Sequence, residues 1–206
     1  QLIRVRTDVL EVAIDPRGGD IVELLLTQYP RRQDRPDVPF QLFERSGERT
    51  YEAQSGLIGD GPDQANGRPL YSSAKTQYTL DEGQEQLVVD LTYSADGVNY
   101  TATGTATYLG AAMWTKEDSY RKISRGDMDD KSLRETVQGG WIAWLQHYFV
   151  TAWIPQPDDT TQVQTRKDSQ GNYIIGFTGP AVTVAPGTQG ETAATLYAGP
   201  KIQGKL

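Results

Sequence analysis

The fold of this chain is decided by the stretch Gly139–Pro155, which reads GGWIAWLQHYFVTAWIP. It holds three of the four tryptophans and the single histidine, and it has no charged residue in a chain that is 23% charged. Uncharged aromatic runs of this kind belong in a hydrophobic core. The stretch therefore marks where the core of the protein lies.

The sequence of this stretch is compatible with either a helix or a strand. At helical spacing one face would collect Trp141, Trp144, Leu145, Tyr148, Phe149 and Ala152, whereas Val150, Thr151, Trp153 and Ile154 favour a strand that Pro155 ends. Because the neighbouring sequence is rich in strand-forming residues, we predict two strands that meet at a bend near Gln146–Tyr148. We expect burial of the side chains Trp141, Ile142, Leu145, Phe149 and Trp153, and a loss of ~3–5 kcal/mol in Trp153→Ala.

Outward from this stretch, short strands alternate with turn signals. We predict strands at Leu2–Ile14, Ile21–Leu26, Phe40–Phe43, Thr50–Gln54, Gln77–Leu80, Gln86–Tyr93, Thr161–Arg166, Tyr173–Phe177, Ala181–Val184 and Thr192–Tyr197. Asp96-Gly97 predicts a hairpin. Loops are predicted at Gln28–Pro39 and Gly56–Pro69, and a solvated strand or irregular segment at Thr115–Lys131. The pattern indicates an all-β sandwich with little helix.

Composition narrows the class of protein. The chain has 206 residues, which fits one domain over residues 1–206, and its net charge of −7 argues against nucleic-acid binding. It has no cysteine, so thiolate metal sites and thiol nucleophiles are excluded. No apolar run of about 18 residues is free of polar interruption, so none is expected to span a bilayer, and we expect a monomer without metal or cofactor.

Candidate catalytic groups are sparse. His147, the only imidazole, lies inside the aromatic run without a nearby nucleophile motif, so we interpret it as a packed or bend residue. Adjacent carboxylates at Asp129/Asp130 and Asp158/Asp159 are interpreted as surface acids. The aromatic residues that could line either the core or a groove are Trp141, Trp144, Tyr148 and Trp153.

Motifs in a fixed order along the chain resemble a known family. They are Thr7–Leu10, Arg17–Asp20, Pro39–Leu42, Ala53–Leu57, Gly61–Asp63, Arg68–Tyr71, Gly110–Ala112, Gly139–Trp141, Tyr148–Phe149, Thr151–Pro155, Leu196–Tyr197 and Gly199–Ile202. On these motifs the chain resembles the large periplasmic domain of YidC, the membrane protein insertase of Gram-negative bacteria. No single motif is diagnostic, but their order over nearly the whole chain is specific.

The resemblance implies a fold, a location and partners. The fold would be a β-supersandwich, similar to galactose mutarotases, tethered between two membrane helices on the periplasmic side of the inner membrane. It implies a non-enzymatic role in membrane protein insertion, dependent on or independent of the Sec translocon. The partners would be SecD/SecF, SecYEG and nascent membrane proteins. No catalytic, cofactor or metal residues carry over, because the mutarotase chemistry needs a histidine pair.

The chain departs from the family pattern at one junction. Members continue into several more strands after the hairpin at Asp96-Gly97, whereas here Tyr100 is followed by the small-residue segment Thr101–Thr107. We therefore expect that a segment is missing at the 100/101 junction, or else that the chain is a short homologue.

Three functions compete at this point. The first is a protein or peptide interaction module of an insertase, and the second is a carbohydrate-binding module of mutarotase-like fold. The third, a mutarotase-like enzyme, is nearly excluded by the histidine count. A sugar site would need two or more tryptophans exposed on one face.

Overall fold

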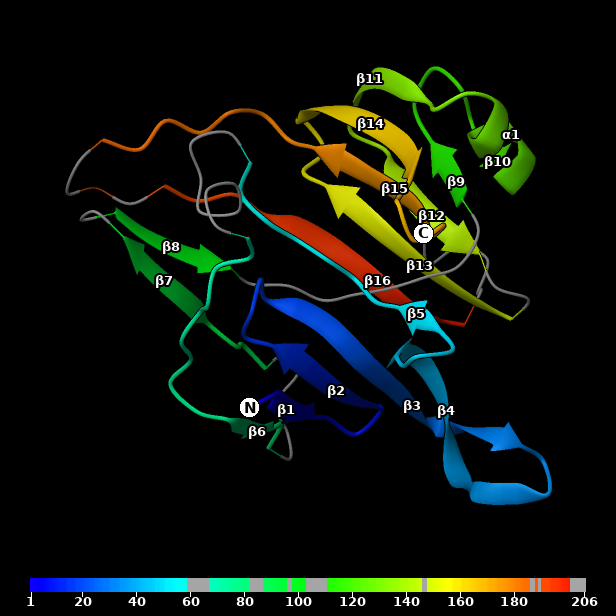
Figure 1. Cartoon of the computed structure of the whole chain (residues 1–206), viewed down its shortest axis with the longest axis vertical. Coiled ribbons are helices and arrows are strands. Elements are labelled where there is room, and N and C mark those ends of the chain that lie inside the picture. The colour runs from blue at the N-terminus through cyan, green and yellow to red at the C-terminus, as the bar shows by residue number, and fades with distance from the viewer. Residues whose placement is uncertain are drawn as a thin grey trace. The chain divides into compact units, whose positions relative to one another are not determined.

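The computed structural model describes residues 1–58, 67–81, 87–95, 98–102, 111–145, 148–185, 188 and 190–200. The chain forms two compact units, the first comprising Gln1–Gly104 with Val184–Gln189 and the second Thr105–Thr183 with Gly190–Leu206 (Figure 1). The prediction of an all-β protein with several antiparallel sheets and little helix is confirmed.

Unit 1 is built on a six-stranded sheet in the order β5-β4-β3-β2-β1-β6. Its strands are β1 Ile3–Arg6, β2 Leu10–Asp15, β3 Asp20–Arg32, β4 Arg35–Arg45, β5 Thr50–Tyr51 and β6 Gln77–Thr79. All of their pairings are antiparallel except β1 with β6. The alternating apolar residues of β2, β3 and β4 bury one face, with Leu24, Leu42 and Phe43 almost fully buried.

Two predictions in this sheet were wrong. Leu2–Ile14 is two strands, because the Thr7 Oγ1 atom accepts hydrogen bonds from the Val9 and Leu10 amides and turns the chain there. The predicted loop Gln28–Pro39 is the outer half of the β3–β4 hairpin. Two of its three prolines, Pro30 and Pro39, lie opposite each other where the register shifts, so the ladder accommodates residues that donate no hydrogen bond.

A two-stranded ribbon completes the described part of unit 1. It pairs β7 Leu91–Ala95 with β8 Val98–Ala102, as the hairpin prediction required, while Asp96 and Gly97 lie outside the described residues. Ser72 and Thr92 bridge the ribbon to the segment after Leu70, and the Tyr71 and Tyr93 rings lie 5.9 Å apart. β7 starts later than the predicted Gln86, and β8 passes without interruption through Tyr100 and Thr101.

Unit 2 is a sandwich of two antiparallel sheets. The larger has the order β10-β9-β12-β13-β16, and the smaller β11-β14-β15. Their strands are β9 Ala111–Trp114, β10 Arg121–Ile123, β11 Arg134–Gln138, β12 Trp141–Leu145, β13 Phe149–Pro155, β14 Thr160–Lys167, β15 Tyr173–Thr178 and β16 Ala194–Pro200. The two-strand prediction for Gly139–Pro155 is thus confirmed by β12 and β13, whose bend residues Gln146 and His147 lie outside the described part.

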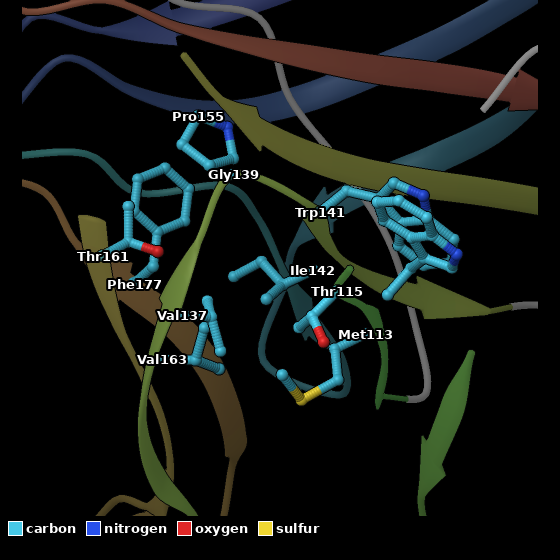
Figure 2. A pocket seen from close by; sticks show the side chains of 11 residues that line it. Met113, Thr115, Val137, Gly139, Trp141, Ile142, Pro155, Thr161, Val163 and Phe177 are labelled. Atoms are coloured by element: carbon cyan, nitrogen blue, oxygen red, sulfur yellow. The ribbon is translucent and has the colours of Figure 1, made fainter. Parts of the chain in front are cut away.

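The two sheets of unit 2 meet in an apolar core. Met113 and Ile142 from the larger sheet face Val137 and Val163 from the smaller one, around a cavity of about 10 Å³ (Figure 2). Such a cavity holds at most one water. The Thr161 hydroxyl lines it, and this buried oxygen has no hydrogen-bond partner among the described residues.

A short helix, α1 Arg125–Asp130, replaces part of the predicted irregular segment Thr115–Lys131. Ser124 caps it: its side chain accepts from the Asp127 amide, and the Asp127 carboxylate accepts from the Ser124 amide. Met128 is the buried anchor of this helix. The six-residue length, with one apolar side chain, gave no helical periodicity to detect.

The last predicted strands had mixed outcomes. Thr161–Arg166, Tyr173–Phe177 and part of Thr192–Tyr197 are confirmed as β14, β15 and β16. Ala181–Val184 is not a strand.

Candidate functional site

Asp20 is a buried carboxylate at the tight turn between β2 and β3. Its relative exposure is 3%, and it is the only charged residue that is buried among those described. The turn needs Gly18 and Gly19, whose φ angles of 83° and 72° lie in the left-handed region that favours glycine. The glycine turn therefore places the carboxylate of Asp20 in the interior of unit 1.

Arg68 neutralises this carboxylate from the other side. Its Nη2 group donates to Asp20 Oδ1, to the Gly18 carbonyl at 3.0 Å and to the Ser55 carbonyl at 2.7 Å. A Cβ atom on Gly18 would clash with Arg68 Nε, so glycine leaves room for the guanidinium in this position. Backbone bonds hold the same junction together, since the Gly18 amide donates to the Pro69 carbonyl and the Tyr71 amide to the Pro16 carbonyl.

Arg45 joins Asp20 to two further carboxylates. It donates to Asp15 Oδ2 at 2.8 Å and to Glu52 Oε2, and its Nη2 atom lies 3.5 Å from Asp20 Oδ2. The Gln54 amide donates to Glu52 at 2.7 Å and to Asp20 at 3.4 Å. We call these residues the Asp20 network; it comprises Asp15, Asp20, Arg45, Glu52, Gln54 and Arg68.

Burial dominates the electrostatics of the Asp20 network. Desolvation raises the pKa of Asp20 to about 6, although the positive charge of Arg68 opposes the shift. The pKa of Arg45 is also raised: burial lowers it, and the hydrogen bonds and charges of Glu52 and Asp15 outweigh that. The arginines thus occupy the carboxylate oxygens, an arrangement that joins segments of chain rather than one that holds a substrate.

The four candidate aromatics do not form one surface. Trp144 is buried at 6% exposure, Trp141 and Trp153 are half-buried, and Tyr148 is 71% exposed. Trp153 lies opposite Ile142 in the β12–β13 register, so Trp153 and Trp144 share one face while Trp141 lies on the other. Of the side chains expected to be buried, Ile142 and Phe149 are, whereas Trp141, Leu145 and Trp153 are only half-buried.

A different set of aromatics does gather in unit 2. Trp114 of β9 lies opposite Trp141 of β12, and the Tyr120 ring is 6.1 Å from the Trp141 ring. Tyr120 is 48% exposed and has a φ of 57°, a strained conformation for a bulky residue. Figure 2 shows the Trp141 ring directed away from the side chains that meet at the cavity. We call Trp114, Tyr120 and Trp141 the aromatic row.

Sequence reasoning missed two of these three residues. Trp114 and Tyr120 precede the charge-free stretch and are separated from Trp141 by a charged segment and a helix. No local pattern joins them. Only the antiparallel register of β9 with β12 could have revealed the pair.

Neither a metal centre nor a membrane-spanning helix is present in the described part of the chain. No group of three or more histidine, cysteine or carboxylate side chains lies close enough there to hold a metal ion. No helix in the same residues has the length and apolar character to cross a bilayer.

Comparison with known sequences decides the family. The family described as "YidC periplasmic domain" matches this chain over residues 2–107 and again over 101–206. The chain belongs to the YidC periplasmic domain family. The resemblance found in the sequence motifs is thus confirmed.

Individual YidC relatives match over the full chain. The protein named "Membrane protein insertase YidC" from Stutzerimonas stutzeri is 69% identical over 252 positions, which cover 100% of this chain and 45% of that protein. Proteins of the same name from Ectopseudomonas mendocina and Pseudomonas fluorescens are 53% and 57% identical and are covered over 47% and 45% of their lengths. This YidC periplasmic chain therefore spans less than half of the relatives it matches.

The YidC motifs acquire a spatial meaning in unit 1. Arg17–Asp20, Ala53–Leu57 and Arg68–Tyr71 are far apart in sequence, yet all three contribute to the Asp20 network or to its backbone bonds. The Ile21 and Ala53 amides also exchange hydrogen bonds with each other's carbonyls, at 2.9 and 3.1 Å. Residues of these three motifs are therefore joined to one another by hydrogen bonds in the folded chain.

Proposed function

We propose that this chain is the periplasmic module of a membrane protein insertase and that it works by binding proteins rather than by catalysis. Its membership of the YidC periplasmic domain family carries the proposal. The name of the relatives, "Membrane protein insertase YidC", supports the insertase role. In the intact protein the module would face the periplasm and be tethered to the inner membrane.

The Asp20 network supports a non-enzymatic role. A general acid or base needs a carboxyl group that reaches a substrate. Here the carboxylates of Asp15, Asp20 and Glu52 are engaged by Arg45 and Arg68, and Asp20 is 3% exposed. The Asp20 network therefore holds β3, the segment after β5 and the Arg68 segment together.

The proposed partners are SecD/SecF, SecYEG and nascent membrane proteins. The test is co-purification of full-length insertase with these proteins, in the presence and absence of this periplasmic module. We expect partner recovery to fall when the module is removed. Equal recovery of every partner without it would contradict the proposal.

A carbohydrate-binding module is the alternative, and the aromatic row is the observation that favours it. Trp114, Tyr120 and Trp141 are each at least partly exposed, as stacking on a sugar ring requires. Calorimetric titration with mono- and oligosaccharides distinguishes the two functions. Millimolar or tighter binding that Trp141→Ala abolishes would replace the insertase proposal with a sugar-binding one.

We also propose that the two compact units form a single domain from which a segment of the family is absent near Tyr100–Thr101. Two observations support the absence of this segment. The alignment with the Stutzerimonas relative has 252 positions against 206 residues here, so at least 46 positions have no counterpart in this chain. The family match also breaks into two parts that overlap only at residues 101–107. Sequencing the gene that encodes the chain would test it.

A further inference from the structure

One uncharged run of unit 2 is not a core segment. Residues 173–183 include no charged residue, yet none of them is buried. The run Gly139–Pro155 is equally free of charge and supplies Ile142, Trp144 and Val150 to the core. An uncharged segment that is left accessible is typical of a surface used for binding.

The core beneath β15 is only partly covered. On β14, Val163 and Thr165 are 1% and 2% exposed, whereas their register partners on β15, Phe177 and Ile175, are half-buried although they share the same face. The smaller sheet ends at β15, because no described strand pairs with its second edge. An added strand at this edge would complete the cover.

The backbone of β15 shows which groups face that edge. The Thr165 amide donates to the Leu133 carbonyl, so Thr165 directs its peptide groups toward β11 and its neighbours Gln164 and Arg166 direct theirs toward β15. Their partners Gly176 and Ile174 point back at β14. The amides and carbonyls of Ile175 and Phe177 therefore point outward, away from β14.

This edge lacks the usual protection against strand addition. Natural edges carry charges, prolines or bulges that block pairing with another chain. Within β15 there is neither a charge nor a proline, and its six-residue register with β14 is unbroken. At the opposite edge of the same sheet, β11 carries Arg134 and Glu135.

We propose that the free edge of β15 binds an extended, apolar segment of another protein by β-strand addition. The occupant would pair its backbone with Ile175 and Phe177 and lay its inward side chains over the partly covered core. A second copy of this chain is disfavoured as occupant, because both copies would carry a net charge of −7. This inference rests on the proposed interaction function and names its docking site.

Fluorescence anisotropy with a defined probe tests the proposal. The probe is a fluorescein-labelled peptide of alternating valine and threonine flanked by glycine and serine, and the protein is the whole chain. Ile175→Pro removes one outward amide and leaves the β14 ladder intact, so we expect binding at least about tenfold weaker. Ile175→Val keeps the amide and is the matched control, with affinity expected within about twofold.

A second measurement does not depend on the folding of the proline variant. With wild-type protein, hydrogen exchange of the Ile175 and Phe177 amides should slow when the peptide is added, while the Ile174 and Gly176 amides are already protected. The same peptide N-methylated at alternate amides should not bind. Unchanged exchange at Ile175 and Phe177, equal binding of the N-methylated peptide, or dimerisation of the free chain through this edge would overturn the proposal.

The outcome is separable from the proposed function. If Ile175→Pro still co-purifies with nascent membrane proteins as wild type does, the β15 edge is not the docking site and the insertase role stands. If the wild-type protein itself recovers no nascent membrane proteins, the proposed function is contradicted, whatever the result for the β15 edge.

Discussion

At the scale of single residues, the most constrained position is the meeting of Gly18, Asp20 and Arg68. The glycine makes space for the guanidinium, and the guanidinium compensates the charge that the turn buries. The turn itself was predictable from Pro16 and the two glycines. Its partner was not, because Arg68 lies 48 residues after Asp20 and no local pattern connects them.

Removal of Arg68 should leave the Asp20 carboxylate buried without its main counter-charge. We expect Arg68→Ala to lower the free energy of unfolding by about 3 kcal/mol at pH 7.5, the low end for a buried pair because the arginine side chain is 31% exposed. Arg68→Lys should recover only part of the lost free energy of unfolding, because a lysine ammonium does not reproduce the planar set of N–H donors of a guanidinium. Urea unfolding of the three proteins measures this, and an unchanged midpoint in Arg68→Ala would contradict it.

Asp20 should also make stability depend on pH. Its pKa is about 6 in the folded protein, against 3.8 ordinarily, so between these values the folded state holds a proton that the unfolded state has released. The stabilising contribution is fully present below pH 3.8 and is lost as the pH rises through about 6. The whole effect amounts to at most about 3 kcal/mol.

The measurement is the difference in unfolding free energy between wild type and Asp20→Asn from pH 3.5 to 8. Asparagine does not titrate, so this difference isolates the carboxyl group. Relative to Asp20→Asn, we expect the unfolding free energy of wild type to be constant below about pH 4 and to fall as the pH rises toward 7. A difference that does not vary over this range would show that the pKa of Asp20 is the same in the folded and unfolded states, and would contradict the prediction.

At the scale of elements, strand-forming residues predicted β12 and β13, but burial of the individual tryptophans depends on which face each strand turns inward. Trp144 and Trp153 share one face of the β12–β13 pair, yet only Trp144 is buried, so sharing a face does not by itself decide burial. The β3–β4 hairpin and α1 were missed for related reasons. Their proline, arginine and aspartate residues are typical of loops. The regular structure is stabilised instead by pairing with a neighbouring strand in the hairpin and by an N-cap in α1.

The two tryptophans therefore differ in their expected cost. We predict that Trp144→Ala lowers the free energy of unfolding by about 3–5 kcal/mol, and that Trp153→Ala, in a half-buried position, costs about half as much. This revises the expectation from sequence for Trp153. Parallel thermal and denaturant unfolding of both variants would test the order, and a larger loss in Trp153→Ala would reverse the assignment of the core.

At the scale of the whole molecule, regular spacing of strands and turns was enough to predict an all-β protein. The sequence did not predict which strands share a sheet. β9 pairs with β12 although β10, α1 and β11 lie between them in sequence, and β16, which comes last in sequence, pairs with β13. Long-range register of this kind is set by packing. The division into two compact units likewise arises from contacts and not from a linker.

We predict that the purified chain is a monomer without bound metal. The net charge of −7 opposes self-association. Analytical ultracentrifugation at micromolar to about millimolar concentration should give one species of 22.8 kDa. Elemental analysis provides the second readout, and a stoichiometric metal or a stable dimer would each contradict the prediction.

The outer half of the β3–β4 hairpin has a practical consequence for limited proteolysis. Arg31 and Arg32 are exposed there, whereas the inner half of β3 buries Leu24 and Leu26 and pairs with β4 at Phe40 and Phe43. A single trypsin cut after Arg32 should therefore leave both pieces in the sheet. The nicked protein would migrate as two bands in denaturing gels and as one particle in gel filtration, with its unfolding still cooperative.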